Sequence, residues 1–282
     1  GLLTFAYDSF GHRTLDARDG MGVAHEYTSR GSLRRTVVLG RFVISYTEDP
    51  DGVTITDAGG ARQRLKRLGD GLLHRGLPNG TVEWSQYDAT GCCLMKAIEW
   101  SSGGVWARRF RYSGEGDLLR VDDSAEGSSE YAYDAAHRLV RAASASGEPR
   151  TFEYDAAGNI LRMPGLRDVA MREGNRLQSA NGDGFEYDAR NHVASRTGAR
   201  RALRYHYDTG DRLTSCEGPD LAWEARYDAA GRRIEKTVNG AITLWYWDGD
   251  RIAAELGPGG ALRVYVYADA LALTPLGFTD YD

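Results

Sequence analysis

The amino-acid sequence predicts an all-β fold, built as an array of antiparallel β-hairpins. Three observations lead to this prediction. A tyrosine–aspartate pair recurs along the 282 residues, in several places at a spacing of 20 or 21 residues. Glycine is abundant, with 35 residues, and suits frequent tight turns. The 16 tyrosines and 6 tryptophans are residue types that favour strands, so turns and strands are expected to alternate at a fixed period.

The tyrosine–aspartate pairs mark one end of each repeat. They are Tyr7-Asp8, Tyr87-Asp88, Tyr133-Asp134, Tyr154-Asp155, Tyr187-Asp188, Tyr207-Asp208, Tyr227-Asp228 and the final pair Tyr281-Asp282. Degenerate copies lie at Tyr27, Tyr46, Tyr112, Trp247-Asp248 and Tyr267, and copies without the aromatic residue lie near residues 67–71 and 172–175. Residues 1–282 are therefore predicted to form one repeat array. Because the chain starts at Gly1 and not at Met, we interpret it as a fragment of a longer protein.

Each regular repeat has the same local order of residues. In the segment that starts at Tyr154, the aromatic residue closes a strand, and Asp155 is expected to accept hydrogen bonds from backbone amides two or three residues on. Gly158 is expected to supply the positive φ angle at the end of the turn, where a Cβ atom would clash. The glycines assigned to such turns are Gly11, Gly91, Gly158, Gly210 and Gly231.

A second turn is expected at the opposite end of each repeat. Asn239-Gly240 lies between two strand-like runs and is a strong signal for a short hairpin. Asn79-Gly80 has the same character, and the run at residues 257–260 is a looser version. Each repeat of about 20 residues is therefore predicted to contain two turns and two strands of about 6–8 residues.

In the last hairpins, large side chains are expected on both faces of the strands. Ile242, Leu244 and Tyr246 are expected on one face, and Thr243, Trp245 and Trp247 on the other. Both faces carry aromatic residues, so neither is expected to be freely solvated. Two interpretations remain open: sheets packed in an ordinary sandwich, or a sheet that curls so that one face lines an enclosed space.

The repeated Tyr-Asp-x-x-Gly units, the segment at residues 246–252 and Thr274-Pro275-Leu276 resemble the Rhs/YD-repeat proteins. These are bacterial polymorphic toxins, with the shell components of insecticidal Tc toxins and the animal teneurins as relatives. The resemblance implies that the hairpins spiral into part of a hollow β-cocoon. It also implies a function in encapsulation, in which the shell encloses and shields the C-terminal toxin domain of a secreted effector until delivery.

The same resemblance implies the partners, the location and the absence of catalysis in this segment. The implied partners are the remainder of the shell, the enclosed toxin polypeptide and secretion components, commonly those of type VI secretion in interbacterial competition. The protein would be made in the bacterial cytoplasm and exported. The family's autoprotease aspartates match no residue of this chain, because the only Asp-Pro-x-Gly run, at residues 49–52, is expected to be a turn.

Composition argues against several other classes of function. The net charge of -5 gives no basic surface for nucleic acid. No apolar run approaches the roughly 18 residues of a membrane span. The cysteines, Cys92, Cys93 and Cys216, form neither a disulfide framework nor a metal-binding spacing, so we expect no metal and no cofactor.

The histidines and one aromatic run carry the remaining hypotheses. His25, His74 and His206 lie in no metal-binding motif, and His12, His137 and His192 are expected at equivalent points just after a turn. The run Trp245-Tyr246-Trp247 is the best candidate for a sugar-binding face. The alternative function is accordingly a recognition module that binds a glycan or a protein partner at a cell surface.

Overall fold

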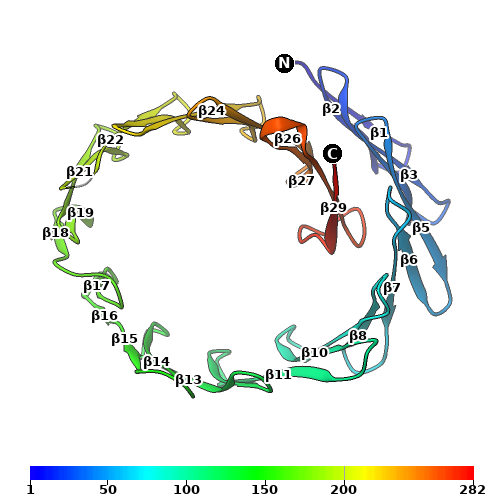
Figure 1. Ribbon diagram of the computed structural model, residues 1–282, viewed down its shortest axis with the longest axis horizontal. Helices are drawn as coiled ribbons and strands as arrows, with labels where there is room; N and C mark the ends of the chain where they lie inside the picture. The colour runs from blue at the N-terminus through cyan, green and yellow to red at the C-terminus, as the bar shows by residue number, and fades with distance from the viewer. Residues whose placement is uncertain (200) are drawn as a thin grey trace. The chain divides into compact units, whose positions relative to one another are not determined.

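The computed structural model describes residues 1–199 and 201–282, and these residues form β-strands and turns (Figure 1). The described part contains no α-helix; its one helical turn is the 3₁₀ helix η1, Pro258–Gly260. The predicted all-β class and the array of antiparallel hairpins are therefore confirmed. None of the described residues belongs to a helix with the length and apolar character needed to cross a membrane.

Strands of five to eight residues make up most of the described chain, with shorter ones between Arg150 and Arg172. The strands of the N-terminal half are β1 (Leu3–Tyr7), β2 (Arg13–Arg18), β3 (Met21–Tyr27), β4 (Leu33–Val38), β5 (Phe42–Asp49), β6 (Gly52–Thr56), β7 (Arg62–Arg67), β8 (Leu72–Gly76), β9 (Val82–Tyr87), β10 (Cys93–Glu99), β11 (Val105–Tyr112), β12 (Leu118–Asp123), β13 (Gly127–Tyr133) and β14 (Leu139–Ser144). Those of the C-terminal half are β15 (Arg150–Thr151), β16 (Glu153–Tyr154), β17 (Ile160–Arg162), β18 (Ala170–Arg172), β19 (Arg176–Ala180), β20 (Asp183–Tyr187), β21 (Val193–Gly198), β22 (Arg201–Tyr207), β23 (Leu213–Gly218), β24 (Leu221–Tyr227), β25 (Arg233–Val238), β26 (Ala241–Asp248), β27 (Arg251–Leu256), β28 (Leu262–Val266) and β29 (Gly277–Tyr281).

The chain divides into two compact units. The first contains residues 1–62, 187–195 and 201–282, and the second contains residues 63–186 and the short stretch that begins at Arg196. Strands that follow one another in sequence mostly pair as antiparallel neighbours, for example β1 to β6 and β22 to β29 in the first unit and β7 to β15 in the second. Within the second unit this pairing is interrupted between β15 and β16 and between β17 and β18, so β16 and β17 form a separate two-stranded sheet. The expectation that residues 1–282 form a single array stays a prediction.

The turns lie where the sequence places them. Asn239 and Gly240 link β25 to β26 with φ angles of 48° and 84°, which are the left-handed values that a two-residue hairpin requires. The copy near residues 67–71, which lacks the aromatic residue, still forms a turn, because the Leu68 amide donates to the Leu72 carbonyl at 2.8 Å. Residues 50–51 connect β5 to β6, so the Asp-Pro-x-Gly run is a turn, as predicted.

The first unit contains two layers of strands that pack face to face. Strand β26 lies against β3 and β2, and β29 lies against β5 and against Asp57, which follows β6. The Tyr46 hydroxyl donates to the Tyr267 carbonyl at 3.2 Å, and the rings of Phe42 and Tyr281 lie 4.6 Å apart. The fully buried aliphatic side chains gather between these layers: Val23, Val38, Ile44, Ile55, Val264 and Val266. In this unit the sandwich interpretation holds.

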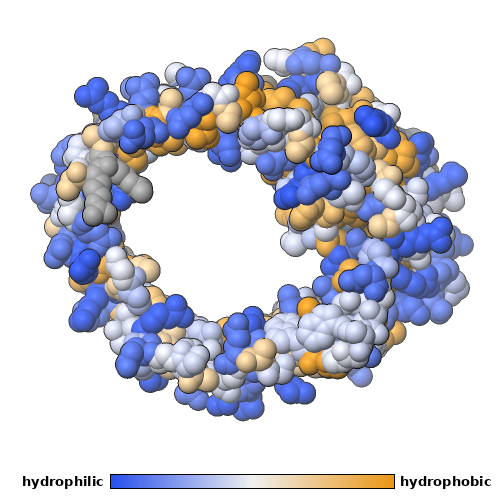
Figure 2. Space-filling view, in the orientation of Figure 1, coloured by the Kyte–Doolittle hydropathy of each residue, from blue (hydrophilic) through white to orange (hydrophobic). Residues whose placement is uncertain are grey.

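The second unit has no comparable core. Among its described residues the strands pack mainly against their neighbours in sequence, and the buried apolar side chains are Ala97, Val121, Ala142 and Ala180. Figure 2 shows the consequence for the surface: hydrophobic residues gather over strands of the first unit, whereas hydrophilic residues dominate over β11 to β16. The second unit is therefore a single layer of strands.

Candidate functional site

The repeated turns share one hydrogen-bonding scheme. Counting the tyrosine as position 1, the aspartate at position 2 accepts two backbone N–H groups with one carboxylate oxygen. In the first turn Asp8 Oδ1 accepts from Phe10 and His12, both at 2.9 Å. The same oxygen of Asp88, Asp134, Asp155, Asp188, Asp208 and Asp228 accepts from residues two and four positions on, at 2.8–3.0 Å. We predicted hydrogen bonds from amides two or three residues on. The second bond comes from the fourth residue instead, because the turn spans five residues.

The side chain at position 6 binds the second oxygen of the same aspartate. Arg138 Nε donates to Asp134 Oδ2 at 2.7 Å, and Arg212 Nε donates to Asp208 Oδ2 at 2.8 Å. His12 and His192 make the equivalent contact through Nδ1 at 2.9 Å. The hydrogen bond from Arg138 holds the pKa of Asp134 below its ordinary value, and Arg212 does the same for Asp208. Asp134 and Asp208 are therefore ionised caps that close their own turns.

The tyrosines join each turn to the one before it. The Tyr227 hydroxyl donates to the carbonyl of Leu213, which is position 7 of the preceding turn, at 2.8 Å. Equivalent bonds run from Tyr27 to Arg13, Tyr112 to Cys93, Tyr133 to Leu118, Tyr154 to Leu139 and Tyr207 to Val193. Trp247 Nε1 donates in the same way to the Arg233 carbonyl at 2.9 Å. Spacing in the sequence revealed the tyrosines, but only the structure shows that their hydroxyls connect successive repeats.

The arginine or histidine at position 6 also contacts the next aromatic ring. The Arg138 guanidinium lies 4.8 Å from the ring centre of Tyr154, and that of Arg212 lies 5.1 Å from the ring centre of Tyr227. The His192 ring is stacked on Tyr207 at 4.3 Å. Consecutive turns are thus held together by a hydrogen bond and a ring contact at the same time.

Two residues differ from their predicted places in the turns. Gly210 lies within its turn, but the positive φ of 63° belongs to the next residue, Asp211, which is at position 5. His137 is not equivalent to His12 and His192: it occupies position 5 with a φ of 59°, and its Nδ1 contacts Asp117 Oδ2 at 2.8 Å. Both differences arise because Asp and His adopt the left-handed region more readily than β-branched residues do. The other assigned glycines, Gly11, Gly91, Gly158 and Gly231, have φ angles of 81–89°.

Asp248 departs most from the prediction that it caps a turn. The hairpin between β26 and β27 has only two linking residues. Asp248 is therefore not followed by the five-residue turn whose backbone amides bind the other aspartates. Its carboxylate instead accepts side-chain hydrogen bonds from three directions: Arg13 Nη2 at 2.6 Å, His25 Nε2 at 2.9 Å and Arg251 Nη2 at 2.6 Å. Since Arg13 and His25 lie on β2 and β3, Asp248 connects the two layers of the first unit.

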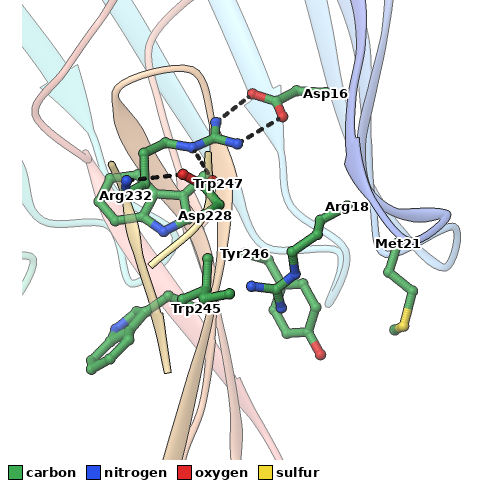
Figure 3. A pocket seen from close by; sticks show the side chains of 9 residues that line it. Asp16, Arg18, Met21, Asp228, Arg232, Trp245, Tyr246 and Trp247 are labelled. Atoms are coloured by element: carbon green, nitrogen blue, oxygen red, sulfur yellow. Dashed lines mark hydrogen bonds and ion pairs between the residues drawn. The ribbon is translucent and has the colours of Figure 1, made fainter. Parts of the chain in front are cut away.

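Asp16 forms a second connection between the same layers (Figure 3). Its Oδ2 accepts from Arg232 Nη1 and from the Gly249 amide, each at 2.8 Å. Arg232 is also the position-6 cation of its own turn and donates through Nε to Asp228 at 2.7 Å. We call the six residues that join β2 and β3 to the C-terminal strands the clasp: Arg13, Asp16, His25, Arg232, Asp248 and Arg251.

The centre of the clasp is buried, and each of its charged side chains has a partner of opposite charge. The side chains of His25 and Asp248 are 2% and 3% exposed. Burial alone would raise the pKa of Asp248, but the hydrogen bond from His25 and the charges of His25 and Arg251 hold it well below its usual range. Together with Asp228, the turn partner of Arg232, the clasp carboxylates of Asp16 and Asp248 face the guanidinium groups of Arg13, Arg232 and Arg251. A partnered network of this kind costs little while complete, but it leaves a buried charge when one member is removed.

One part of the clasp has the order of groups found in hydrolase triads. The Thr36 hydroxyl lies 3.0 Å from His25 Nδ1, and His25 Nε2 contacts the Asp248 carboxylate. However, Thr36 is 5% exposed, and Asp248 is shared with two arginines. The contacts of this buried group join β3, β4 and β26.

The remaining candidate residues have structural surroundings. Trp245 is buried; Arg233 and Lys236 lie over its ring at 4.8 and 5.5 Å, and its Nε1 donates to Glu255, so this ring is no open platform for a sugar. Cys92, Cys93 and Cys216 are free thiols. Among residues 1–199 and 201–282, no cluster of three His, Cys, Asp or Glu side chains could hold a metal ion.

Sequence reasoning did not identify Asp16, His25 and Arg13 as clasp residues. Their partners lie more than 200 positions away in the chain, so no local spacing points to them. A weak signal existed at Asp248, because position 5 after Trp247 is Arg251 where a regular repeat has glycine. That departure indicates a different turn, but not the partners of its carboxylate.

Comparison with protein families supports the repeat interpretation. The Teneurin YD-shell family matches residues 79–253, more than half of the chain. Double-stranded DNA deaminase toxin A of Burkholderia cenocepacia is 34% identical over 195 residues, which are 64% of this chain and 14% of that protein. Toxin protein Tse5 of Pseudomonas aeruginosa is 30% identical over 213 residues, which are 60% of this chain and 16% of that protein. This chain therefore spans only a small part of the length of these relatives.

A solved structure shows the same fold. The Tc holotoxin pore of Photorhabdus luminescens contains a chain that aligns with 94% of this chain at a TM-score of 0.50, and the alignment covers 17% of that longer chain. Sequence identity over the alignment is 14%. At this level of identity the likeness concerns the arrangement of hairpins alone.

Proposed function

Because this chain belongs to the Teneurin YD-shell family, we propose that it forms a wall segment of an Rhs-type shell that encloses and shields a toxin. The observation that carries the proposal is the family match over residues 79–253, which covers the hairpins whose turns are joined by tyrosine hydrogen bonds. The role of the chain itself is structural, and any toxic activity belongs to the enclosed domain.

Containment follows from the backbone pairing. Neighbouring strands in a sheet lie about 4.8 Å apart, so a polypeptide cannot pass between two paired strands. A hairpin that pairs with both neighbours leaves no gap for a protease or for the cargo. The bonds from Tyr154, Tyr207 and Tyr227 to the preceding turns keep the ends of these hairpins closed as well. The tyrosine–aspartate turns are in this proposal the elements that hold the wall together.

The partners and the location follow from the same proposal. The wall segment associates with the remainder of the shell and with the enclosed toxin polypeptide. The names of two relatives describe them as toxins, and their bacterial sources support export of this protein as a bacterial effector. We propose that export occurs through a secretion apparatus such as type VI, in competition between bacteria.

Limited proteolysis of the complete polypeptide that carries residues 1–282 tests the proposal. We expect its toxin region to resist protease while folded in the shell and to be cut when the toxin region is expressed alone. An Asp248→Ala variant, in which the clasp is broken, is expected to expose the toxin region. Arg35→Ala, which breaks an exposed pair with Glu26, is the matched control and is expected to behave like the wild type. A toxin region that is cut equally fast in the complete wild-type protein and alone would refute the proposal.

A further inference from the structure

Strand pairing in the second unit is interrupted twice within one short region. Strands β16 and β17 form a two-stranded sheet of their own, so pairing stops between β15 and β16 and again between β17 and β18. None of the described side chains between Ala142 and Ala180 is buried. Ile160 and Leu161 of β17 are 39% and 40% exposed. The region therefore has neither continuous backbone pairing nor a core that stabilises it.

The first interruption, between β15 and β16, is bridged by the contacts of a regular repeat. The Tyr154 hydroxyl donates to the Leu139 carbonyl at 2.9 Å. The Arg138 guanidinium lies over the Tyr154 ring at 4.8 Å, and its Nη1 donates to the Asp155 carbonyl at 3.2 Å. Strand β16 is thus connected to β14 through its turn, although β15 and β16 do not pair.

The second interruption, between β17 and β18, lacks the tyrosine bond, and we call it the seam. Met171 stands at position 1 of the next turn, because it pairs with Leu177 beside a bulge. Tyr227 has the same register with Arg233 in a regular repeat. Methionine has no hydroxyl to donate to the carbonyl of Ile160, which is position 7 of the preceding turn. The bond that joins successive turns elsewhere therefore cannot form at the seam.

The position-6 contact is also altered at the seam. Position 6 of the preceding turn is Asn159, an uncharged residue, and Met171 offers it no aromatic ring. Asn159 Nδ2 donates to Asp155 Oδ2 at 2.8 Å within its own turn, and to Asn175 Oδ1 across the seam at 3.3 Å. The second of these bonds is long for an amide donor. A weak amide bond thus stands where other repeats have a tyrosine bond and a ring contact.

The backbone beside the seam explains why β17 and β18 do not pair. A tight turn follows β17, in which the Leu166 amide donates to the Met163 carbonyl at 3.0 Å. The chain that leaves this turn departs from extended geometry at Asp168, whose φ is 56°. A strand resumes only at Ala170, where β18 begins. The interruption is therefore a property of the local backbone.

We propose that the seam is the place at which the second unit opens. Strand β17 separates from β18, while the strands on either side keep their pairing. Local opening is favoured where few apolar contacts and few backbone hydrogen bonds must be broken, and the seam has few of both. This opening is a property of the chain and requires no cargo. In the proposed shell, an extended polypeptide crosses the wall at the seam; this consequence rests on the proposed function.

Native-state hydrogen exchange of the complete polypeptide that carries residues 1–282 tests the opening. In the wild type we expect amides of β17 and β18 to exchange faster than those of β13 and β14, which take part in tyrosine bonds. Met171→Tyr supplies a hydroxyl at position 1, so exchange at the seam should slow about fivefold, the effect of one neutral hydrogen bond. Met163→Tyr adds the same side chain outside position 1 and is the matched control, with exchange like the wild type.

The bridged interruption supplies an independent measurement. Tyr154→Phe removes the hydrogen bond to Leu139 but keeps the ring, so exchange in β16 is expected to become about fivefold faster. Equal exchange at the seam and in β14 of the wild type would overturn the proposal. Unchanged exchange in Met171→Tyr, or equal slowing by Met171→Tyr and Met163→Tyr, would overturn it as well.

Limited proteolysis of the toxin region tests the consequence for the shell. Cutting follows the population of the open form when opening is fast, so Met171→Tyr is expected to slow it about fivefold relative to Met163→Tyr. Slower exchange at the seam with an unchanged rate of cutting would refute passage at the seam. A toxin region that is cut equally fast in the complete wild-type protein and alone would refute the enclosure, whereas hydrogen exchange would still decide whether the seam opens.

Discussion

The two units of the chain are stabilised in different ways. In the first unit two layers of strands enclose a core in which Val23, Ile44 and Val264 are at most 2% exposed. In the second unit one layer of strands buries little more than alanines and Val121. Both units contain the same repeat with the same turn scheme. The repeat therefore builds hairpins wherever it occurs, but a core forms only where a second layer covers the first.

The second unit compensates with polar contacts along its strands. Asp123 at the end of β12 accepts from the Ala125 amide, Arg108 Nε and Trp106 Nε1 at 2.8, 2.7 and 3.1 Å. The Ala125 and Glu126 amides, with Arg108 and Trp106, lower the pKa of Asp123 to about 2. Cross-strand pairs of this kind are the main stabilising contacts available to a single layer. We expect the second unit to be the less stable of the two.

The largest expected effect comes from breaking the clasp. Asp248→Ala leaves Arg13 and Arg251 without their carboxylate between two layers, and we expect a loss of about 3–5 kcal/mol in the free energy of unfolding. Asp208→Ala removes the corresponding aspartate from a regular, more exposed turn and should lower the free energy of unfolding by much less. Urea unfolding of both variants measures the difference. Equal losses would show that Asp248 is an ordinary turn residue.

A matched pair of valines compares the two units directly. Val23→Ala removes two methyl groups from the closed core and should cost about 2–3 kcal/mol, because the rigid layers cannot collapse into the space. Val121→Ala, in the single layer, should cost about 1 kcal/mol, because solvent and neighbouring side chains fill the space. Native-state hydrogen exchange of amides in β3 and β12 reports each local stability. A larger loss for Val121→Ala would contradict the absence of a core in the second unit.

Alkaline pH is expected to weaken the first unit. Burial raises the pKa of Tyr46 from 10.0 to about 12, so this side chain keeps its proton in the folded protein when the unfolded chain has lost it. The corresponding stability is complete below pH 10 and is lost as the pH rises to 12, by about 2 kcal/mol. Urea unfolding between pH 9 and pH 12 measures this slope. Tyr46→Phe should flatten it; an unchanged slope would assign the effect to other groups.

The smallest effect concerns a single tyrosine bond in the second unit. Tyr133→Phe removes the hydrogen bond to the Leu118 carbonyl at 3.1 Å and should cost about 1 kcal/mol. Because the bond joins two turns, loss of protection is expected in the turns on both sides of it. Hydrogen exchange at Asp117 and Arg138 checks this expectation, with Tyr131→Phe as a control outside the turns. A change confined to one turn would show that the tyrosine acts locally.

Several features were predictable because they depend on neighbours in sequence. The turn at Asn239 and Gly240 forms as expected, since positive φ angles at adjacent residues suit these two residue types. Even the copy near residue 68, which has lost its tyrosine, keeps its turn. The position of the left-handed residue was less certain: at the turn of Tyr207 it is Asp211 and not Gly210. In that turn the fixed length determines which position takes the positive φ angle, even though the neighbouring glycine would adopt it more readily.

The sequence by itself determined the hairpin, its five-residue turn and its recurrence, because the bonds of Asp155 to residues 157 and 159 close within a few positions of the chain. Only the tertiary structure decided that the Asp248 carboxylate binds His25 and Arg13 and not the amides of its own turn. It also decided that Val23 is covered by a second layer, whereas Val121 lies in a single layer. The reason is physical: a turn is selected by the conformational preferences of adjacent residues, whereas burial depends on which distant strands meet.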